Sequence, residues 1–589
     1  MALALSCMMV APSHAFLPLP HTHSMTIASA GRIVDLHKRK SPIVTHSSSS
    51  LYMAANGGNS GDANNGEAID YDTMEPQVYP QRWVQLGYLS MLALMSDWIC
   101  FSVAAAPQTY ENSFGHSAAS LIDMFLFMNV ASCFLVTDIV AKVGLQRAIQ
   151  GAGALMTLGC WFRCGFSFLV PVAQAVGLDA TQLLASSSSS DSGLVPYPFI
   201  VVGTLMVGAA QPFFQCTPPL LSATWFGADE RSTSTAVALN FNQIGIATAF
   251  LVGGAMATDP VGLEQYFGLV AILCTIVAIG TFLQFENLPP SPPSSSAMDK
   301  LKAGEAEPPF LESVQTLFAT NGFTRPLAAF VCSIAITNIV GVSKLLLRIY
   351  YLGCHEVFLH YGFVLSHLDV ISFIQTFIDD VMKRGGITEQ FEIDLAGAGF
   401  EVAILLGGIV IGGYVDRTKE YKKVTMACIA SSAALLIPLG LTEHQIGNEP
   451  ILLILALFGL GMAAGPVQPI NAELAVDVTY PGDETAVESV QQIGGNLMSA
   501  LLVPIAEKAA SMDYQILPKN PELASDIRGD VVLLTVIAGI TLAYFSSFDA
   551  PLRRTIADCA DNGGTCEIPP DDDVIDVPLT EAEKELLSR

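Results

Sequence analysis

The stretch "WFGADERSTSTAVALNFNQIG", residues 225–245, places three consecutive charges ahead of a long run of small, polar and apolar residues. The charges belong to Asp229, Glu230 and Arg231. Acidic side chains are favoured at the start of a helix, because the helix dipole is positive there. The stretch therefore predicts that a helix begins near Glu230 and continues through a segment that is apolar enough to lie in a bilayer.

Composition assigns the chain to the integral membrane proteins. Hydrophobic residues make up 51% of its 589 residues, charged residues make up 14%, and the mean hydropathy is +0.48. A soluble domain of average composition is less apolar than this. One helix needs about 20 apolar residues to cross the hydrocarbon core. Twelve runs approach or reach this length, and they lie at 83–106, 117–140, 148–171, 197–220, 232–256, 264–285, 325–341, 395–415, 423–441, 450–471, 485–506 and 530–549.

A polar segment divides these runs into two sets of six. The segment "NLPPSPPSSSAMDKLKAGEAEPP", residues 287–309, is too rich in proline and charge to span a membrane. Segments rich in proline and serine form flexible linkers. The sequence therefore predicts an N-terminal six-helix bundle at 81–286, a cytosolic-type linker at 287–324 and a C-terminal six-helix bundle at 325–552.

Basic residues are concentrated in the loops on the linker side. The opposite loops, at 107–116, 172–196 and 257–263, contain no Lys or Arg. Loops rich in Lys and Arg remain on the cytoplasmic side of a membrane. We therefore expect both termini and the linker on that side.

The stretch around Glu230 recurs in the second half as "TYPGDETAVESVQQIGGNLM", residues 479–498. In both stretches an asparagine follows the glutamate by twelve positions, so Asn242 pairs with Asn496 as Glu230 pairs with Glu484. Such echoes predict a parallel internal repeat of the kind found in transporter folds. Because both glutamates begin helices on the linker side, we assign them to the gating residues. A second echo lies just upstream, between "AAQPFFQ" at 209–215 and "PVQPINAE" at 466–473.

These residues carry a family resemblance. The stretch "SATWFGADERSTSTAVALNFNQIGIATAFLVGG", residues 222–254, resembles the region of the fourth and fifth helices in the feline leukaemia virus subgroup C receptor-related transporters of the major facilitator superfamily. Their tenth helix resembles "NAELAVDVTYP" at 471–481, and the similarity covers roughly residues 80–552. The resemblance implies an all-α, twelve-transmembrane-helix major facilitator fold of two six-helix bundles with pseudo-twofold symmetry. Members of that family transport choline and ethanolamine, and haem export has also been assigned to them.

A central binding site is expected on three helices. The first predicted helix carries Asp97 and Trp98 in "LMSDWICFS", near the membrane midplane. An aromatic face attracts a quaternary ammonium, and Trp98 matches the substrate-contacting tryptophan of the family. The family also pairs Gln243 with a glutamine of the eleventh helix, where this chain has Asn496, with Gln492 one turn earlier. We expect these five residues to converge on one cavity.

Each of these residues also has a structural interpretation. Polar groups within the membrane need a partner in any case. Trp98 could pack against a neighbouring helix, Asp97 could bond within the bundle, and Gln243 could join two helices. Asp97 could also neutralise a cation or carry a coupling proton.

A loop signature predicts a gate on the linker side. The sequence "GGYVDRTKEYKK" matches the superfamily pattern G-x-x-x-D-R-x-K, and Asp416 and Arg417 are suited to a charge latch. In the equivalent loop of the first half, Ala141 and Lys142 stand where the Asp and Arg belong. A latch of this kind is therefore expected from the second half alone.

The ends of the chain lie outside this scheme. Residues 1–56 combine a short apolar core with a basic, serine-rich stretch, which is typical of a targeting presequence. The presequence favours a plastid membrane, with a plain secretory signal and the plasma membrane as alternatives. The segment 57–80 and the tail 553–589 are acidic and are expected to be disordered. Cys559 and Cys566 in the tail could pair, although free thiols are the favoured interpretation.

One segment fits no membrane pattern. Residues 342–369 interrupt the seventh predicted helix with three histidines, a lysine and an arginine. A haem or metal site is conceivable, but the histidines show no recognised ligand spacing. Removal of the segment joins "ITNIVG" to "VISFIQTFIDD" and restores a continuous apolar run. We therefore favour a retained intron, which a transcript containing the segment would rule out.

The sequence favours a transporter of a small organic solute, a choline-like or ethanolamine-like cation or a haem-related compound. The alternative is a membrane receptor or scaffold that does not transport. An enzyme is not expected, because the chain shows no nucleophile–base pair, phosphate loop or metal-ligand cluster. We expect no cofactor and no nucleic-acid partner, and we expect a monomer in the lipid bilayer.

Overall fold

The computed structural model describes most of the chain. All described residues belong to one compact unit, Asp70–Arg589. The described ranges are 76–116, 118–164, 194–303, 308–342, 377–442, 449–516 and 525–560. The presequence, the acidic segment up to residue 75, the anomalous insert from residue 343 onward and the tail from residue 561 lie outside them.

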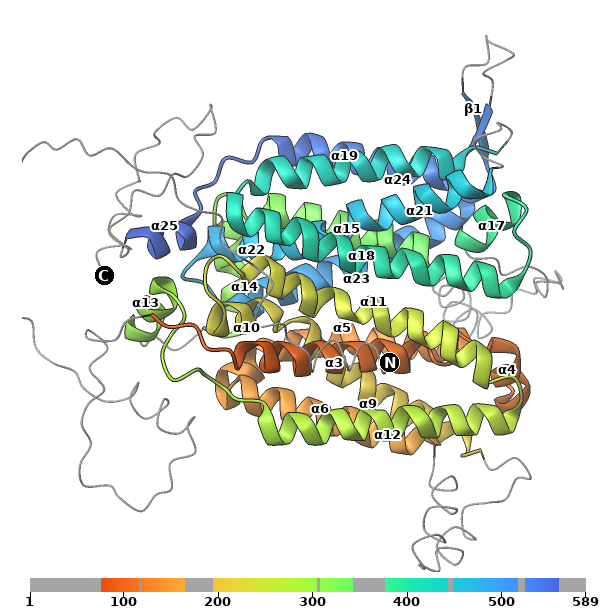
Figure 1. The fold of residues 1–589 in the computed structure, drawn as a ribbon, viewed down its shortest axis with the longest axis horizontal. Coiled ribbons are helices and arrows are strands. Elements are labelled where there is room, and N and C mark those ends of the chain that lie inside the picture. The colour runs from red at the N-terminus through yellow and green to blue at the C-terminus, as the bar shows by residue number, and fades with distance from the viewer. Residues whose placement is uncertain are drawn as a thin grey trace, which may run out of the picture. The chain divides into compact units, whose positions relative to one another are not determined.

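Helices form nearly all of the ordered structure (Figure 1). The first half contains α3 (Arg82–Phe101), α4 (Pro107–Phe114), α5 (Ala118–Val143), α6 (Leu145–Cys164), α9 (Tyr197–Gln215), α10 (Pro218–Trp225), α11 (Arg231–Met256) and α12 (Pro260–Gln284). The connection between the halves contains α13 (Ser295–Ala303) and α14 (Phe310–Ala319). The second half contains α15 (Thr324–Val342), α17 (Phe377–Arg384), α18 (Gln390–Thr418), α19 (Tyr421–Gly440), α21 (Pro450–Ala464), α22 (Val467–Thr479), α23 (Glu484–Ala510), the antiparallel strands β1 (Asp513–Ile516) and β2 (Ser525–Arg528), α24 (Gly529–Ser546) and α25 (Arg553–Ala560).

Each of the twelve predicted runs coincides with a helix or with a pair of consecutive helices. Within the described residues, nine helices are long and apolar enough to cross a membrane, or ten if the bent pair α14 and α15 forms one span. The spans Tyr197–Trp225 and Pro450–Thr479 each contain a break. The first break precedes Pro218 and the second falls at Pro466, because proline lacks the amide that would continue the helical hydrogen-bond ladder. The echoed stretches 209–215 and 466–473 lie beside these two breaks.

Two separate hydrophobic cores fill the two halves. One core is built from residues of α3 to α12 and the other from residues of α15 to α24. In Figure 1 the helices of the second half lie above those of the first, and α11 lies between α3 and α18. We name the end that carries α13 and α25 the linker end, and the opposite end, with α4 and α17, the far end.

Helix α11 approaches both neighbours closely because small residues face them. A Cβ placed on Gly245 would lie 2.2 Å from the carbonyl oxygen of Leu94 in α3. A Cβ placed on Gly408 of α18 would lie 2.3 Å from the Asn240 side chain of α11. Small residues at helix interfaces allow this approach within a membrane. Helix α11 therefore joins the two halves.

The linker and the start of the tail are ordered, which corrects two predictions. The linker was expected to be flexible, but the side chains of Ser291, Ser294, Ser295 and Ser296 are buried. Residues 553–560 were expected to be disordered, but they form α25. Helix α13 of the linker contacts helix α25 of the tail. Each segment is therefore stabilised by the other, which the composition of either segment alone does not indicate. Cys559 is disulfide-bonded, so the expectation of a free thiol is wrong for that residue.

Gly245 should tolerate no side chain. We expect Gly245→Ala to destabilise the protein by about 1–3 kcal/mol through overpacking, which outweighs the gain of up to about 1 kcal/mol from helix propensity. A lower Tm in detergent, followed by tryptophan fluorescence, would show this. The control is Gly539→Ala in α24, where a Cβ meets no atom within 4 Å. The control should show an unchanged or slightly raised Tm from helix propensity alone, and the same result for Gly245→Ala would contradict the close packing of α3 and α11.

Candidate functional site

A cavity of about 100 Å³ lies between the two halves. Among the described residues, its polar lining consists mostly of carboxamides, with one carboxylate, Asp97, and one hydroxyl, Thr337. The first half supplies the carboxamides of Asn129, Gln211, Gln215, Asn242 and Gln243, and the second half supplies those of Asn338, Gln468, Gln492 and Asn496. Phe101 is the aromatic residue of the described lining. The cavity is therefore hydrogen-bonding, almost uncharged and poor in aromatic faces.

Four of the five residues predicted for the site line this cavity. They are Asp97, Gln243, Gln492 and Asn496. Trp98 does not line it, contrary to the expectation from the family resemblance. The Trp98 side chain is buried, and its Nε1 donates a hydrogen bond of 2.9 Å to the Tyr266 hydroxyl of α12. Successive residues of a helix point about 100° apart, so with Asp97 facing the cavity Trp98 faces α12.

A chain of hydrogen bonds runs across the cavity and ends on Asp97. Asn496 Nδ2 of α23 donates to Asn129 Oδ1 at 3.5 Å, and Asn129 Nδ2 donates to Gln211 Oε1 at 2.6 Å. Gln211 Nε2 then donates to Asp97 Oδ1 at 2.6 Å. Each amide thus donates toward the carboxylate, so the chain is polarised in one direction. It links the two halves through side chains that line the cavity.

Some acceptors in the cavity lack a donor. Asp97 Oδ2 and Asn242 Oδ1 are buried and have no donor in good hydrogen-bonding geometry among the described residues, although the Asn242 side chain also interacts with the Asp97 carboxylate. Buried polar atoms without partners cost free energy. The cavity therefore favours a solute that donates hydrogen bonds to a carboxylate and an amide oxygen.

Several residues of the cavity lining were not predicted from the sequence. Gln211 and Gln468 occupy equivalent places in the two echoed stretches, and both line the cavity. The repeat itself could therefore have identified them. No comparable signal marks Asn129 or Asn338, because a single amide in an apolar run does not show which face of the helix it occupies.

At the linker end the predicted latch residue Asp416 binds the start of α11. Asp416 Oδ1 accepts from the Ser232 amide at 2.8 Å, and Oδ2 accepts from the Thr233 amide at 2.8 Å and its hydroxyl at 2.7 Å. The first amides of a helix have no partner within the helix. Helix α18 of the second half therefore caps α11 of the first.

The equivalent helix of the second half is capped differently. Asp483 precedes α23 and accepts hydrogen bonds from its own helix, from the amides of Thr485 at 2.8 Å and Ala486 at 3.3 Å. Glu230, the N-cap residue of α11, makes no side-chain hydrogen bond to the first amides of its own helix. Ala141, at the latch position of the first half, has no oxygen in its side chain to offer. Among the described residues, the cap that joins the two halves is thus present at α11 and replaced by a local cap at α23.

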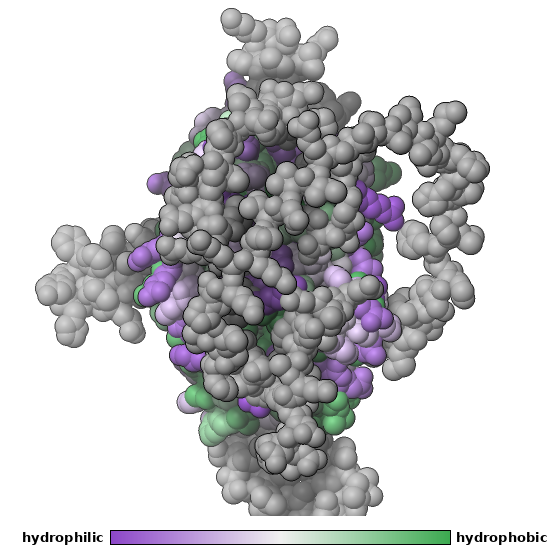
Figure 2. Space-filling model, turned by 90° about the vertical axis from the view of Figure 1, so that its left-hand side faces the viewer, coloured by the Kyte–Doolittle hydropathy of each residue, from purple (hydrophilic) through white to green (hydrophobic). Residues whose placement is uncertain are grey.

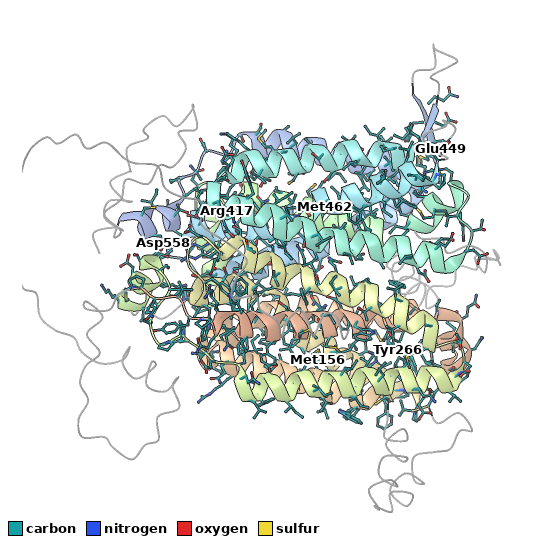
Figure 3. The ribbon with its side chains drawn as sticks, viewed as in Figure 1. Met156, Tyr266, Arg417, Glu449, Met462 and Asp558 are labelled. Carbon is teal, nitrogen blue, oxygen red and sulfur yellow. The ribbon has the colours of Figure 1, made fainter. Side chains whose placement is uncertain are left out.

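The other gating residues contact different partners. Arg82 donates two hydrogen bonds to Glu230, at 2.9 and 3.0 Å, within the first half. Glu484 pairs with Lys300 of the linker helix α13. Arg417 is exposed at the linker end, where Figure 3 also shows Asp558, opposite Glu449 at the far end. The hydrogen bonds of Asp416 described above join the two halves.

Neighbouring contacts reinforce this end. Lys419 Nζ donates to the carbonyl oxygen of Ala228 at 2.6 Å, and burial lowers the pKa of Lys419. Arg231 pairs with Asp558 of α25 at 2.7 Å. Burial opposes the ionisation of Asp558, but Arg231 and hydrogen bonds from Ser296 outweigh it and hold the pKa of Asp558 below its usual value. Hydrophilic side chains surround this end of the described structure (Figure 2).

Comparison with known proteins identifies the family. A sequence model of the Major Facilitator Superfamily matches residues 86–503, more than half of the chain. The chain belongs to the Major Facilitator Superfamily. This confirms the predicted all-α, twelve-helix transporter fold and the family resemblance. The protein is a membrane transporter, and the alternative of a non-transporting receptor finds no support.

Relatives within the Major Facilitator Superfamily refine this picture. Solute carrier family 49 member A3 of Xenopus tropicalis is 23% identical over 461 residues, which cover 75% of this chain and 81% of that protein. The choline/ethanolamine transporter FLVCR2 of Homo sapiens is 22% identical over 490 residues, which cover 81% of this chain and 79% of that protein. The solved structure of the transporter FucP in its outward conformation has a TM-score of 0.50 at 12% identity and covers 79% of this chain and 100% of its own. That likeness concerns the fold alone.

The capping of α11 by Asp416 can be measured by hydrogen exchange. Asp416→Ala removes the acceptor of two amides, and a hydrogen bond to a charged group contributes about 1.5–3 kcal/mol. We therefore expect exchange at residues 232–234 to accelerate by about 10- to 100-fold, measured by mass spectrometry. The matched control is Asp483→Ala, which should accelerate exchange at the start of α23 and spare α11. Unchanged exchange at α11 in Asp416→Ala would contradict the latch.

Proposed function

We propose that this transporter carries a small hydroxylated organic cation of the ethanolamine and choline class by alternating access. One observation carries the proposal: the carboxylate of Asp97 lies in a cavity between the halves whose other polar lining residues are uncharged. A carboxylate away from bulk water favours a cation. The printed function of the human relative, a choline/ethanolamine transporter, supports the same solute class.

The chemistry of the lining favours a primary ammonium over a quaternary one. An ammonium group with N–H donors can bond to Asp97 Oδ2 and Asn242 Oδ1, which have no donor in good hydrogen-bonding geometry among the described residues. A quaternary ammonium has no N–H and is held by aromatic faces. Phe101 provides the aromatic face in the described lining, and Trp98 points toward α12. We therefore place ethanolamine-like solutes ahead of choline.

The size of the cavity favours a small solute over haem. Its volume is about 100 Å³, whereas sites for drug-sized ligands range from about 300 to 1,000 Å³. Solutes of a few heavy atoms match this space, and a porphyrin exceeds it. The carboxamides around the cavity can accept and donate hydrogen bonds, which suits the hydroxyl of such a solute.

The transport cycle follows from the contacts between the halves. A solute bound between two bundles is released to the other side when the bundles rock about it. In the structure the halves are held together at the linker end by Asp416. Opening of that end requires loss of these hydrogen bonds. The proposed role is that of a carrier without a chemical step.

Location in a plastid membrane remains a prediction from residues 1–56.

Uptake by purified protein in proteoliposomes tests the proposal. We expect saturable uptake of labelled ethanolamine, with stronger competition by unlabelled ethanolamine than by choline. Asp97→Asn should lower the apparent affinity by about 10- to 100-fold, because a hydrogen bond to a charged group contributes about 1.5–3 kcal/mol. Trp98→Phe is the comparison variant and should retain the KM of the native protein. Full uptake by Asp97→Asn, or a larger loss in Trp98→Phe, would refute this site.

A further inference from the structure

A second buried acid lies at the interface of the halves, outside the cavity lining. Glu401 sits within the predicted span Glu392–Thr418, and only 6% of its surface is exposed. Its Oε2 is buried and makes no hydrogen bond within the described residues. No ion pair of Glu401 is described either. An acid in this environment is costly to keep charged and favours binding of a proton.

The packing of α18 on α11 fixes the depth of Glu401. Near the far end, Gly254 of α11 lies beside Asp394 of α18, and toward the linker end Asn240 lies beside Gly408. The two helices are thus antiparallel. On α18, Glu401 is midway between Asp394 and Gly408. On α11, Ala247 is midway between Asn240 and Gly254, so Glu401 and Ala247 lie at the same depth along the two helices.

The packing of α3 on α11 places Asp97 at the same level. A Cβ on Gly245 would meet the backbone of Leu94 and Trp98, and a Cβ on Gly253 would meet Ala105. Helices α3 and α11 therefore run parallel, and Asp97 lies beside residues 245–247 of α11. Asp97 and Glu401 therefore flank the same small-residue section of α11, one from each half.

The charged and titratable groups near Asp97 and Glu401 decide whether the two acids can influence each other. Among the described residues, neither Asp97 nor Glu401 forms an ion pair with a basic side chain. On α6, the Arg163 guanidinium is bound to the Ile99 carbonyl and the Ser102 hydroxyl. Other titratable groups lie on the helices packed against α3 and α18. Beside α3 they include Cys160 and Cys164 on α6, Tyr197 on α9, Glu264, Tyr266 and Cys274 on α12, with Tyr266 bound to Trp98, and the acids and bases near the ends of α5. Beside α18 they include Tyr421 and Cys428 on α19, Glu473 and Asp477 on α22, with Glu473 bound to Arg554, and the acids and bases near the ends of α11 and α17.

We propose that Glu401 is the proton-binding residue of a cation–proton exchange and that it is coupled electrostatically to Asp97. The inference rests on the proposed function, because Asp97 is the residue expected to bind the organic cation. The hydrogen bond from Gln211 stabilises the charged form of Asp97. A charged Asp97 favours the protonated form of Glu401, since two like charges in a low dielectric repel.

A cation at Asp97 removes this repulsion and makes loss of the Glu401 proton easier. Its positive charge offsets that of Asp97, and the Glu401 proton leaves to the solution on the open side. The pair then holds either one proton and no solute, or one cation and no proton, and both forms carry one net negative charge. A cation transported in one direction is therefore exchanged for one proton in the other. The exchange is electroneutral, so a pH gradient drives it and a membrane potential does not.

A pH gradient across proteoliposomes tests the coupling. With an acidic lumen, we expect the native protein to accumulate labelled ethanolamine up to about tenfold per pH unit, as one-for-one exchange requires. Initial rates are compared with those of protein-free liposomes, because diffusion of the uncharged amine reaches the same limit of about tenfold per pH unit once it equilibrates. We expect the initial rate of Glu401→Gln to fall to that of protein-free liposomes, while this variant still exchanges labelled for unlabelled ethanolamine at equal pH. Glu392→Gln, an exposed acid on the same helix, is the control and should accumulate solute like the native protein.

The outcomes separate this inference from the proposed function. Gradient-driven accumulation by Glu401→Gln would overturn the role of Glu401. Exchange by the native protein without any effect of the pH gradient, or accumulation driven by the opposite gradient, would overturn the coupling and leave the solute assignment intact. Absence of any ethanolamine exchange would overturn both. If Glu401→Gln loses exchange as well, Glu401→Asp decides: accumulation faster than in protein-free liposomes supports the inference, and exchange without such accumulation overturns it.

Discussion

A polar group inside a bilayer has no water to bind, so its partner must come from the protein. This constraint organises the structure. The guanidinium of Arg163 is bound to a backbone carbonyl and a hydroxyl, and the amides of the cavity donate to one another until the chain ends on Asp97. The first amides of α11 bind Asp416 from the other half for the same reason. Groups that lack a protein partner then become informative, because they mark where a solute or a proton binds.

Helix α11 brings these features together. It packs closely on α3 through Gly245 and on α18 through Gly408, its first turn is capped from the second half, and its middle contributes Asn242 and Gln243 to the cavity. A helix that makes contacts of this kind on two faces cannot shift toward one half without a change at the other. The solute site and the closed linker end are therefore parts of one mechanical element.

Much of this was predictable from sequence, and the failures have a common cause. Apolar runs fix where spans begin and end, and the echo between Glu230 and Glu484 revealed the repeat. Depth in the membrane follows from position along a run, but the direction of a side chain does not. Asp97 and Trp98 share one depth and point about 100° apart, so Trp98 was placed in the cavity wrongly, and Glu401 was overlooked. The pairing of Arg231 with Asp558 joins segments 327 residues apart, which no local pattern reveals.

The two helix caps at the linker end have an energetic consequence for the carrier as a whole. The two halves are related by an axis along the membrane normal, so a carrier with identical halves would carry two such caps between the halves at the same end. Here α23 keeps its own cap at Asp483 in either state, whereas α11 has its described cap from Asp416 only while the linker end is closed. Opening that end exposes amides that have to be solvated anew. Because Ala141 stands where the first half would need an Asp, the linker end has one described cap of this kind between the halves in place of two, and fewer hydrogen bonds have to break when that end opens.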